Sequence, residues 1–578
     1  MNQGVDDPHA ANDVHRYPFA GAENPRVRLG VVSIPDGDGE TAGETQEPIW
    51  FDAQLAAPFG DDFYLARVDW SPAGWAEGAD GPVLLAQVQS RDQSALAVVQ
   101  LNPHTGEGTT LFTERSESWV NLHDIIAFLD GGELLWASEA DGWCHLHVRS
   151  AADGSLVRRL TEGAWHVDVS GLIAVDAAAD GFAYFLGNPQ RAILPPGGES
   201  GGASDGGVDA LEYAEQHLFR VRLDGSSAGR PERLTRTAGF HAGVTIAHDR
   251  SMFVTQFSSV TEPMTACLVA VPPPASPEDP VASTAQHWVS AKAGTMTTLL
   301  SARALDPRVE ALGRVLSPPR FETFRSTDGA VTLQACLYLP DPSVHGDGPY
   351  PTVVSCYGGP HVQFVQNSWG RMAADLSSQM LRSEGFLVLK VDNRGSDRRG
   401  LAFEAAVRAN LGAVEVDDQV ACVKHAVTLG LCDPARVGIM GWSYGGYLSA
   451  MCLAKAPDTF RCAVAGAPVT HWDGYDTHYT ERYMGGTPST QPEAYAQSSV
   501  MAHVDHIEGA LLLIHGLMDE NVHFRHTARL VQALTEHQKA YELLTFPNER
   551  HSPRSLKDRT FMEQRVFAFL DKWLRAGD

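Results

Sequence analysis

The sequence predicts an incomplete β-propeller followed by an α/β domain whose sheet is doubly wound and mostly parallel. Residues 1–310 contain short apolar strands separated by polar turns, whereas residues 311–578 alternate strand-length apolar runs with amphipathic segments. A chain of 578 residues is also too long for one compact core, which favours two domains. We therefore expect a propeller domain over 1–310 and an α/β domain over 311–578.

The amino-terminal part contains repeated four-strand units. Strand-like runs such as FYLARVDW, VLLAQVQS, ELLWASEA and HLFRVRLDG are separated by DG, NP and GG turns. A strand that begins with HL, followed by a short strand that ends in LT, occurs twice, and such repetition is typical of β-propellers. About four full units and a partial one can be counted, and a β-sandwich is the alternative. Stretches rich in Gly or Pro at 195–207 and 271–280 predict loops within the third and last units.

The carboxy-terminal part contains six apolar runs of strand length, separated by amphipathic segments. These runs lie at 351–357, 386–392, 436–441, 462–467, 510–516 and 541–546. Strands that are apolar on both faces and alternate with helices predict a parallel sheet covered by helices on both sides.

One motif in this part carries chemistry. Gly441-Trp442-Ser443-Tyr444-Gly445 has the form G-x-S-x-G, with a strand before it and a helix-forming segment after it. This arrangement is typical of the nucleophile elbow of α/β-hydrolases, where the serine occupies a sharp turn with no room for flanking side chains. We predict Ser443 as a nucleophile and the backbone N–H of Tyr444 as a donor to an oxyanion.

A serine hydroxyl needs a general base, which in this fold follows an acid further along the chain. Asp519 comes just after the apolar run 510–516, at the sheet edge where ligands gather, and His551 follows the next strand. We predict Asp519 as the orienting acid and His551 as the base. Glu520 is an alternative acid, and His515 and His523 are alternative bases.

A second oxyanion donor should come from the loop after an earlier strand. The segment Cys356-Tyr357-Gly358-Gly359-Pro360 occupies that place. Either a backbone N–H of this loop or the hydroxyl of Tyr357 would donate.

Composition excludes several other classes of protein. The net charge of −27 argues against nucleic acid as a partner, and no run of eighteen apolar residues predicts a membrane span. The eight cysteines form no CxxC pair and most lie in apolar stretches, which favours free thiols over disulfides or a zinc site. Residues 1–16 lack the apolar core of a secretory signal. We expect a cytoplasmic protein that needs no metal or organic cofactor.

Several motifs resemble the prolyl oligopeptidase family, in particular its dipeptidyl peptidase IV branch. They are GWSYGGY (441–447), APVTHWDGYDTHYTERYMG (467–485), HGLMDENVHF (515–524), PNERHS (547–552) and CYGGP (356–360). In the propeller part, WVNLHDI (119–125) and WASEADGWCHLHV (136–148) are most similar to the cytosolic dipeptidyl peptidases. The resemblance implies release of dipeptides from free peptide amino termini, with proline or alanine as the second residue, and it also implies a homodimer and short peptides as substrates.

The resemblance also assigns roles to individual residues. It implies that the Tyr357 hydroxyl donates to the oxyanion and that Asn521 donates to the carbonyl of the substrate's first residue. It further implies a small apolar pocket for the proline ring, whose walls are Val469, Trp472, Tyr475, Tyr479 and Val522.

One feature departs from the family. Its members hold the substrate ammonium with two adjacent propeller glutamates, and this sequence contains no Glu-Glu pair. Glu139, in SEADG, is a single carboxylate in a different context, and we do not assign that role to it. The family propeller also has eight blades, so the resemblance predicts a chain that begins partway through the propeller. The alternatives are an oligopeptidase or acylaminoacyl peptidase of the same family, an inactive truncated fragment that serves as a binding module, and a small-molecule esterase.

Overall fold

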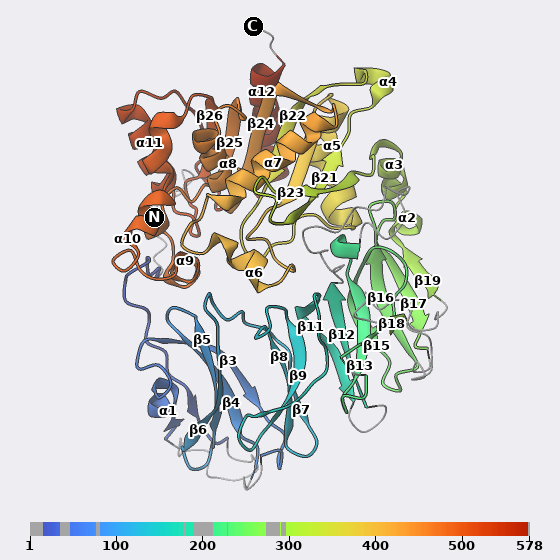
Figure 1. Ribbon diagram of the computed structural model, residues 1–578, viewed down its shortest axis with the longest axis vertical. Helices are drawn as coiled ribbons and strands as arrows, with labels where there is room; N and C mark the ends of the chain where they lie inside the picture. Colours follow the sequence, from blue (N-terminus) through green and yellow to red (C-terminus); the bar gives the residue numbers. More distant parts are fainter. Residues whose placement is uncertain are drawn as a thin grey trace, which may run out of the picture.

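The computed structural model describes residues 16–34, 47–76, 81–176, 181–188, 212–227, 229–272, 289–290 and 296–575. Two parts lie one above the other in Figure 1: a set of antiparallel sheets, and an α/β unit that carries both helical layers. The sheets come from the amino-terminal half and the α/β unit from the carboxy-terminal half, as the sequence predicts.

The described part of the propeller contains four blades in chain order. The first blade contains β3 (Phe63–Trp70), β4 (Leu84–Ser90), β5 (Ala95–Leu101) and β6 (Gly108–Arg115), and the second contains β7 (Ile126–Leu129), β8 (Glu133–Ser138), β9 (His145–Ser150) and β10 (Leu156–Arg159). The third contains β11 (His166–Asp176), β12 (Phe182–Asn188), β13 (His217–Arg222) and β14 (Glu232–Arg233), with β18 (Val289–Ser290) beside β14. The fourth contains β15 (Phe240–Ile246), β16 (Met252–Ser258), β17 (Thr265–Ala270) and β19 (Met296–Ser301). The short pair β1 (Gly30–Val31) and β2 (Ile49–Trp50) and helix α1 (Asp52–Ala56) precede them. The propeller prediction is confirmed, and the β-sandwich alternative is wrong. The loop predicted at 195–207, and all but two residues of that at 271–280, lie outside the described residues.

Blades pack face to face through apolar side chains, which is what makes the array a propeller and not a set of separate sheets. Trp136 of the second blade packs with Leu85 and Val98 of the first, and Trp165 packs beside Phe185 and Phe219 of the third. Each of these side chains is fully buried or nearly so.

The HL…LT repeat in the sequence has a structural cause. The Nδ1 atom of His145 lies 3.0 Å from the Oγ1 atom of Thr161, which also accepts from the N–H of Leu146 at 2.9 Å. In the next blade, the Nδ1 atom of His217 lies 3.0 Å from the Oγ1 atom of Thr235, which also accepts from the N–H of Leu218 at 3.0 Å. The threonine thus ties the start of one strand to the end of the blade in both units.

The carboxy-terminal half is built on one eight-stranded sheet in the order β20-β21-β23-β22-β24-β25-β26-β27. The pairs β20·β21 and β21·β23 are antiparallel and the other pairs are parallel. The strands are β20 (Arg320–Arg325), β21 (Thr332–Tyr338), β22 (Tyr350–Cys356), β23 (Leu387–Asp392), β24 (Cys432–Trp442), β25 (Cys462–Gly466), β26 (Ala510–Gly516) and β27 (Glu542–Phe546). The six predicted runs correspond to β22–β27, and β20 and β21 extend the sheet.

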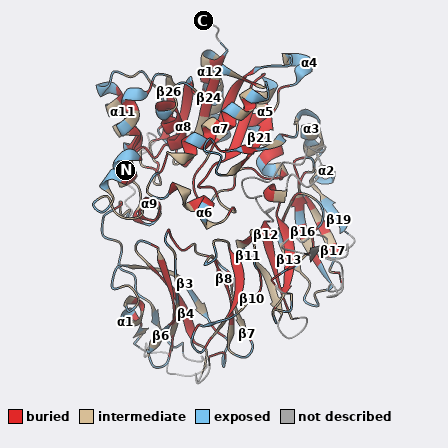
Figure 2. Cartoon of the chain, viewed as in Figure 1, coloured by how far each residue is buried: buried red, intermediate tan, exposed pale blue. Residues whose placement is uncertain are grey.

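Helices cover both faces of this sheet, and two separate apolar clusters fill the spaces between. The helices of this half are α4 (Pro342–His345), α5 (Leu376–Ser383), α6 (Leu401–Glu404), α7 (Val414–Thr428), α8 (Tyr444–Lys455), α9 (Thr477–Met484), α10 (Pro492–Gln497), α11 (Arg525–Glu536) and α12 (Leu556–Leu574). Figure 2 shows the central strands buried along their length. This is the doubly wound arrangement predicted from runs that are apolar on both faces.

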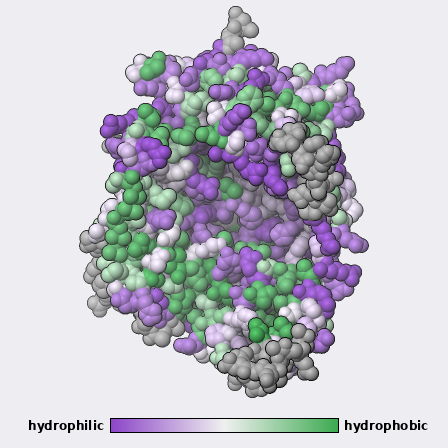
Figure 3. Space-filling view, turned by 180° about the vertical axis from the view of Figure 1, so that it is seen from behind, coloured by the Kyte–Doolittle hydropathy of each residue, from purple (hydrophilic) through white to green (hydrophobic). Residues whose placement is uncertain are grey.

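Two helices, α2 (Ala302–Leu305) and α3 (Pro307–Val315), connect the halves. The division predicted between residues 310 and 311 falls inside α3 and stays a prediction. On the face opposite to that of Figure 1, a hollow opens at mid-height, and its walls are largely hydrophilic (Figure 3).

Candidate active site

Ser443 lies at the turn between β24 and α8, in the order that the elbow motif predicts. Its φ of 59° and ψ of −115° place it in a region that non-glycine residues rarely adopt. The N–H of Ser443 donates to the carbonyl of Gly466 at 2.8 Å, and its carbonyl accepts from the N–H of Tyr447 at 3.0 Å. These bonds hold the strained residue between strand β25 and the first turn of α8.

The glycines around Ser443 are required by close backbone contacts. A Cβ atom on Gly445 would lie 2.4 Å from the carbonyl oxygen of Cys356, and one on Gly446 would lie 2.3 Å from that of Gly466. A Cβ atom on Gly441 would meet the carbonyl oxygen of Gly445 at 2.4 Å. The absence of side chains therefore lets the elbow pack directly on the ends of β22 and β25.

His551 and Asp519 are in direct contact. The Nδ1 atom of His551 lies 2.7 Å from Oδ2 of Asp519, and Oδ1 of Asp519 accepts from the N–H groups of Asn521 and Val522 at 3.0 and 2.9 Å. Burial by itself would raise the pKa of Asp519, but hydrogen bonds from His515 and His551 outweigh it and lower the pKa to about 2. The carboxylate is thus ionised and aimed at the His551 ring.

A contact from the elbow holds the histidine loop. The indole Nε1 of Trp442 donates to the backbone carbonyl of His551 at 2.8 Å. Because Trp442 precedes Ser443 in the chain, this bond brings the loop of His551 alongside the serine turn.

The alternative residues occupy other positions. His515 is buried; its Nε2 lies 2.8 Å from the Val522 carbonyl and 3.2 Å from Oδ2 of Asp519, and its Nδ1 lies 2.7 Å from the Thr527 hydroxyl. His515 therefore contacts Asp519 from within the core and helps to hold its carboxylate in place. Glu520 pairs with Arg550 at 3.2 Å, and the His523 ring packs on the ring of Tyr17 with centroids 4.5 Å apart.

The two tyrosines predicted as oxyanion donors lie beside each other, with ring centroids 6.1 Å apart. The hydroxyl of Tyr444 is turned into the core, where it donates to Oε1 of the buried Glu415 at 2.7 Å, so its backbone N–H is the group left for a ligand. Tyr357 follows β22 and is half-buried; burial raises the pKa of its hydroxyl, which keeps it a proton donor.

The residues of the predicted apolar pocket also come together. The rings of Trp472 and Tyr479 stack with centroids 6.0 Å apart and planes 15° from parallel, and Tyr475 meets both edge-on. The hydroxyl of Tyr475 donates to Oδ1 of Asn521 at 2.7 Å, which leaves the amide nitrogen of Asn521 to meet a ligand. Val469 and Val522 are buried in the same apolar cluster as Trp472.

Around the site lie residues to which the sequence assigned no role. Tyr17, from the segment that precedes the propeller, donates to the backbone carbonyl of Asn521 at 2.8 Å. Glu139 and Glu404 lie where the propeller meets the catalytic domain, and both accept from the amide of Asn121 at 2.9 Å. The guanidinium of Arg482, on α9, donates to Oδ1 of Asn121. Only the three-dimensional fold brings these segments together.

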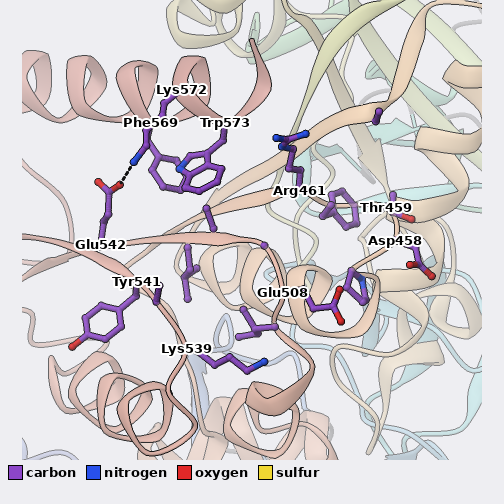
Figure 4. A pocket seen from close by; sticks show the side chains of 18 of the residues that line it. Asp458, Thr459, Arg461, Glu508, Lys539, Tyr541, Glu542, Phe569, Lys572 and Trp573 are labelled. Carbon is purple, nitrogen blue, oxygen red and sulfur yellow. Dashed lines mark hydrogen bonds and ion pairs between the residues drawn. The ribbon is translucent and has the colours of Figure 1, made fainter. Parts of the chain in front are cut away.

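Two cavities differ in their relation to this site. One of about 690 Å³ lies between the domains and is lined by Trp119, Asn121 and Glu139 on one side and Leu401 and Arg408 on the other. Another, of about 890 Å³, lies at the amino ends of β25–β27 (Figure 4), at the opposite edge of the sheet from Ser443. Its rim carries the Lys572–Glu542 ion pair at 3.3 Å.

Within the described residues, no cluster of three or more His, Cys, Asp or Glu side chains could hold a metal ion. None of the helices in this described part of the chain has the length and apolar character of a membrane span.

Comparison with known proteins agrees with this architecture. Residues 372–577 match the model of the prolyl oligopeptidase family, and residues 2–264 match the model of the dipeptidyl peptidase IV N-terminal region. The chain belongs to the prolyl oligopeptidase family. The match to the second model places it in the dipeptidyl peptidase IV branch.

Individual relatives cover nearly the whole chain. It is 32% identical to dipeptidyl peptidase 8 of Mus musculus and of Homo sapiens over 97% of its length. The chain spans 63% and 62% of the length of these two relatives. The crystal structure of Porphyromonas gingivalis dipeptidyl peptidase 4 superposes with a TM-score of 0.77 at 24% identity, covering 99% of this chain and 71% of that one, which supports the fold.

Proposed function

We propose that this chain is a serine peptidase that releases amino-terminal dipeptides, with proline or alanine as the second residue, from short peptides. The observation that carries the proposal is the bond from Trp442, the residue before the strained Ser443, to the loop of His551, whose Nδ1 lies 2.7 Å from an ionised aspartate. Its membership of the dipeptidyl peptidase IV branch supports the substrate class.

In the proposed reaction, the Ser443 hydroxyl attacks the carbonyl carbon after the second residue while Nε2 of His551 takes its proton. Asp519 fixes the tautomer by accepting from Nδ1–H and stabilises the imidazolium that forms. The Tyr357 hydroxyl and the Tyr444 N–H donate to the tetrahedral oxyanion, each contributing about 3 kcal/mol by comparison with similar sites. The protonated histidine then passes its proton to the leaving amine, and water hydrolyses the acyl-enzyme.

The aromatic pocket supports a small, rigid second residue. Its stacked and edge-on rings form flat apolar walls at fixed angles, which fit a five-membered ring and leave no room for a long side chain. In this proposal, the amide nitrogen of Asn521 donates to the carbonyl of the first residue.

A second candidate function is supported by one observation. Members of the family hold the substrate ammonium with two adjacent glutamates, and this sequence contains no Glu-Glu pair. An oligopeptidase or acylaminoacyl peptidase does not bind a substrate ammonium, so it does not need the glutamate pair and would use the same triad.

Hydrolysis of Gly-Pro and Ala-Pro chromogenic amides beside their N-acetylated forms distinguishes the two candidates. Cleavage of the free amines alone supports the dipeptidyl peptidase, and equal cleavage of both forms supports the second candidate. Ser443→Ala is the control and should lower kcat by about 10⁶-fold. If neither form is cleaved while a fluorophosphonate still labels Ser443, the proposed activity is wrong for this chain.

We also propose a reducing, cytoplasmic location, supported by eight buried free cysteines, and a homodimer. Light scattering on the purified chain tests the dimer.

A further inference from the structure

We propose that the segment Tyr17–Gly21, hereafter the strap, is a positioning element of the substrate pocket and that Tyr17 is its principal positioning residue. The inference rests on the function proposed above. The sequence predicts these residues as part of the propeller domain, but they lie on the catalytic domain beside α9. In Figure 1 the dark blue start of the chain runs from the first blade toward α9 and α10.

Backbone bonds fix the strap to the turn that precedes α9. The N–H of Ala20 donates to the carbonyl of Tyr475, and the N–H of Thr477 donates to the carbonyl of Pro18, both at 3.0 Å. Between them, Phe19 pairs with Asp476 as an antiparallel bridge. The strap therefore acts as a short strand that holds the backbone on both sides of Asp476, the residue directly after Tyr475.

The side chain of Tyr17 reaches the other half of the pocket. Its hydroxyl donates to the backbone carbonyl of Asn521 at 2.8 Å, and its ring packs against those of His523 and Tyr475. The N–H of the same Asn521 donates to Asp519 at 3.0 Å. The loop that carries the catalytic acid is thus held from outside by Tyr17.

The contacts of the strap with Tyr475 and with Asn521 converge on the hydrogen bond between the side chains of these two residues. The Tyr475 hydroxyl orients the Asn521 amide at 2.7 Å, and the strap fixes the backbone of both residues. If either backbone shifts, the amide nitrogen that faces the substrate shifts with it. The strap therefore acts on substrate binding more than on proton transfer at Ser443.

The far end of the strap is locked to the propeller by buried charge. Glu481 of α9, whose side chain is 1% exposed, accepts from the N–H of Gly21 at 2.8 Å and from two nitrogens of Arg91 at 2.7 Å. Arg91 belongs to the turn after β4 of the first blade, and it also donates to the carbonyl of Ala22 at 2.7 Å. Arg91 thus links the first blade, the segment that follows the strap, and helix α9.

Tyr17→Phe tests the proposal because it removes only the hydroxyl and keeps the ring. We expect KM for the cleaved dipeptide amide to rise roughly 3- to 10-fold, the size of one lost hydrogen bond, with kcat changed less than 2-fold. Labelling of Ser443 by a fluorophosphonate without a peptide part should keep its rate. Tyr495→Phe is the matched control: it deletes a hydroxyl that donates to the carbonyl of Gly486 at 2.9 Å, beyond the end of α9.

Hydrogen exchange of the peptide that spans residues 517–524 provides a readout that needs no substrate. We expect faster exchange in Tyr17→Phe than in the wild type and no change in Tyr495→Phe. An unchanged exchange rate, or an equal loss of thermal stability in both variants with KM unaltered, would overturn the proposal. A wild-type chain that cleaves no dipeptide amide would overturn only the proposed function, since exchange still decides the role of Tyr17.

Discussion

The indole Nε1 of Trp442 and the backbone carbonyl of His551 are joined by a 2.8 Å hydrogen bond across 109 residues of sequence. The carbonyl belongs to the predicted general base, and the indole belongs to the residue before the predicted nucleophile. The ring of the same His551 is bonded to Asp519 through Nδ1. The bond from Trp442 therefore ties the position of the His551 loop to that of the serine turn.

Trp442→Phe should lower kcat about 5- to 10-fold with little change in KM, because loss of this bond costs about 1 kcal/mol of positioning. Steady-state kinetics and the rate of fluorophosphonate labelling both report it, and both should fall together. Trp75→Phe is a matched control, since the Trp75 indole donates to the carbonyl of Glu133 at 2.7 Å within the propeller. A Trp442→Phe enzyme with wild-type kcat would show that the bond does not position His551.

Gly445→Ala should destabilise the catalytic domain by about 3 kcal/mol or prevent its folding, because the new Cβ would lie 2.4 Å from the Cys356 carbonyl oxygen. Thermal unfolding and soluble yield measure the effect. Gly370→Ala makes the same chemical change at a position where a Cβ meets no atom within 4 Å, and its Tm should match the wild type. Equal stability of both variants would contradict the steric account of the elbow.

The elbow and its partners could be predicted from sequence because local rules fix them. G-x-S-x-G between a strand and a helix specifies a turn whose geometry is set by its own glycines, and Asp519 follows directly from the end of β26. The blades could be predicted for a similar reason. The HL…LT repeat in the sequence corresponds to the same histidine–threonine contact in two successive blades.

The strap could not be predicted in this way. Tyr17 and Asn521 are 504 positions apart, and nothing in the local sequence of either indicates the other. The same holds for Glu139 and Glu404, which only the docking of propeller on catalytic domain brings to one asparagine. Contacts between domains depend on how the surfaces of two folded domains fit together. The periodicity of the sequence within each domain carries no information about that fit.

The cysteines should be unreactive in the folded protein. All eight are free and buried, and burial raises the thiol pKa of Cys356 and Cys462 to about 12 and that of Cys432 to about 11. Because the thiolate is the reactive form, a disulfide reagent at pH 8 should modify less than about one thiol per chain before unfolding. In denaturant, all eight should react. Rapid reaction of several thiols in the native state would contradict their burial.

Glu139→Gln should stabilise the protein at high pH and leave it unchanged at low pH. Burial raises the pKa of Glu139 from 4.5 to about 7; the hydrogen bond from Asn121 opposes this effect, and the charge of Asp397 adds to it. The folded protein therefore holds this proton more tightly than the unfolded chain, so stability falls as pH rises from about 4.5 to about 7 and stays low above that range. A neutral glutamine avoids this loss.

Thermal unfolding of the wild type and of Glu139→Gln across this pH range measures the difference. We expect a gain of about 3 kcal/mol at about pH 8 that vanishes near pH 4.5, because stability falls by about 1.4 kcal/mol for each pH unit between 4.5 and the raised pKa of about 7. Glu107→Gln removes an exposed carboxylate of the first blade and should show no such trend. A gain of equal size at both ends of the range would mean that the substitution acts through packing and that the Glu139 carboxylate carries no buried charge at neutral pH.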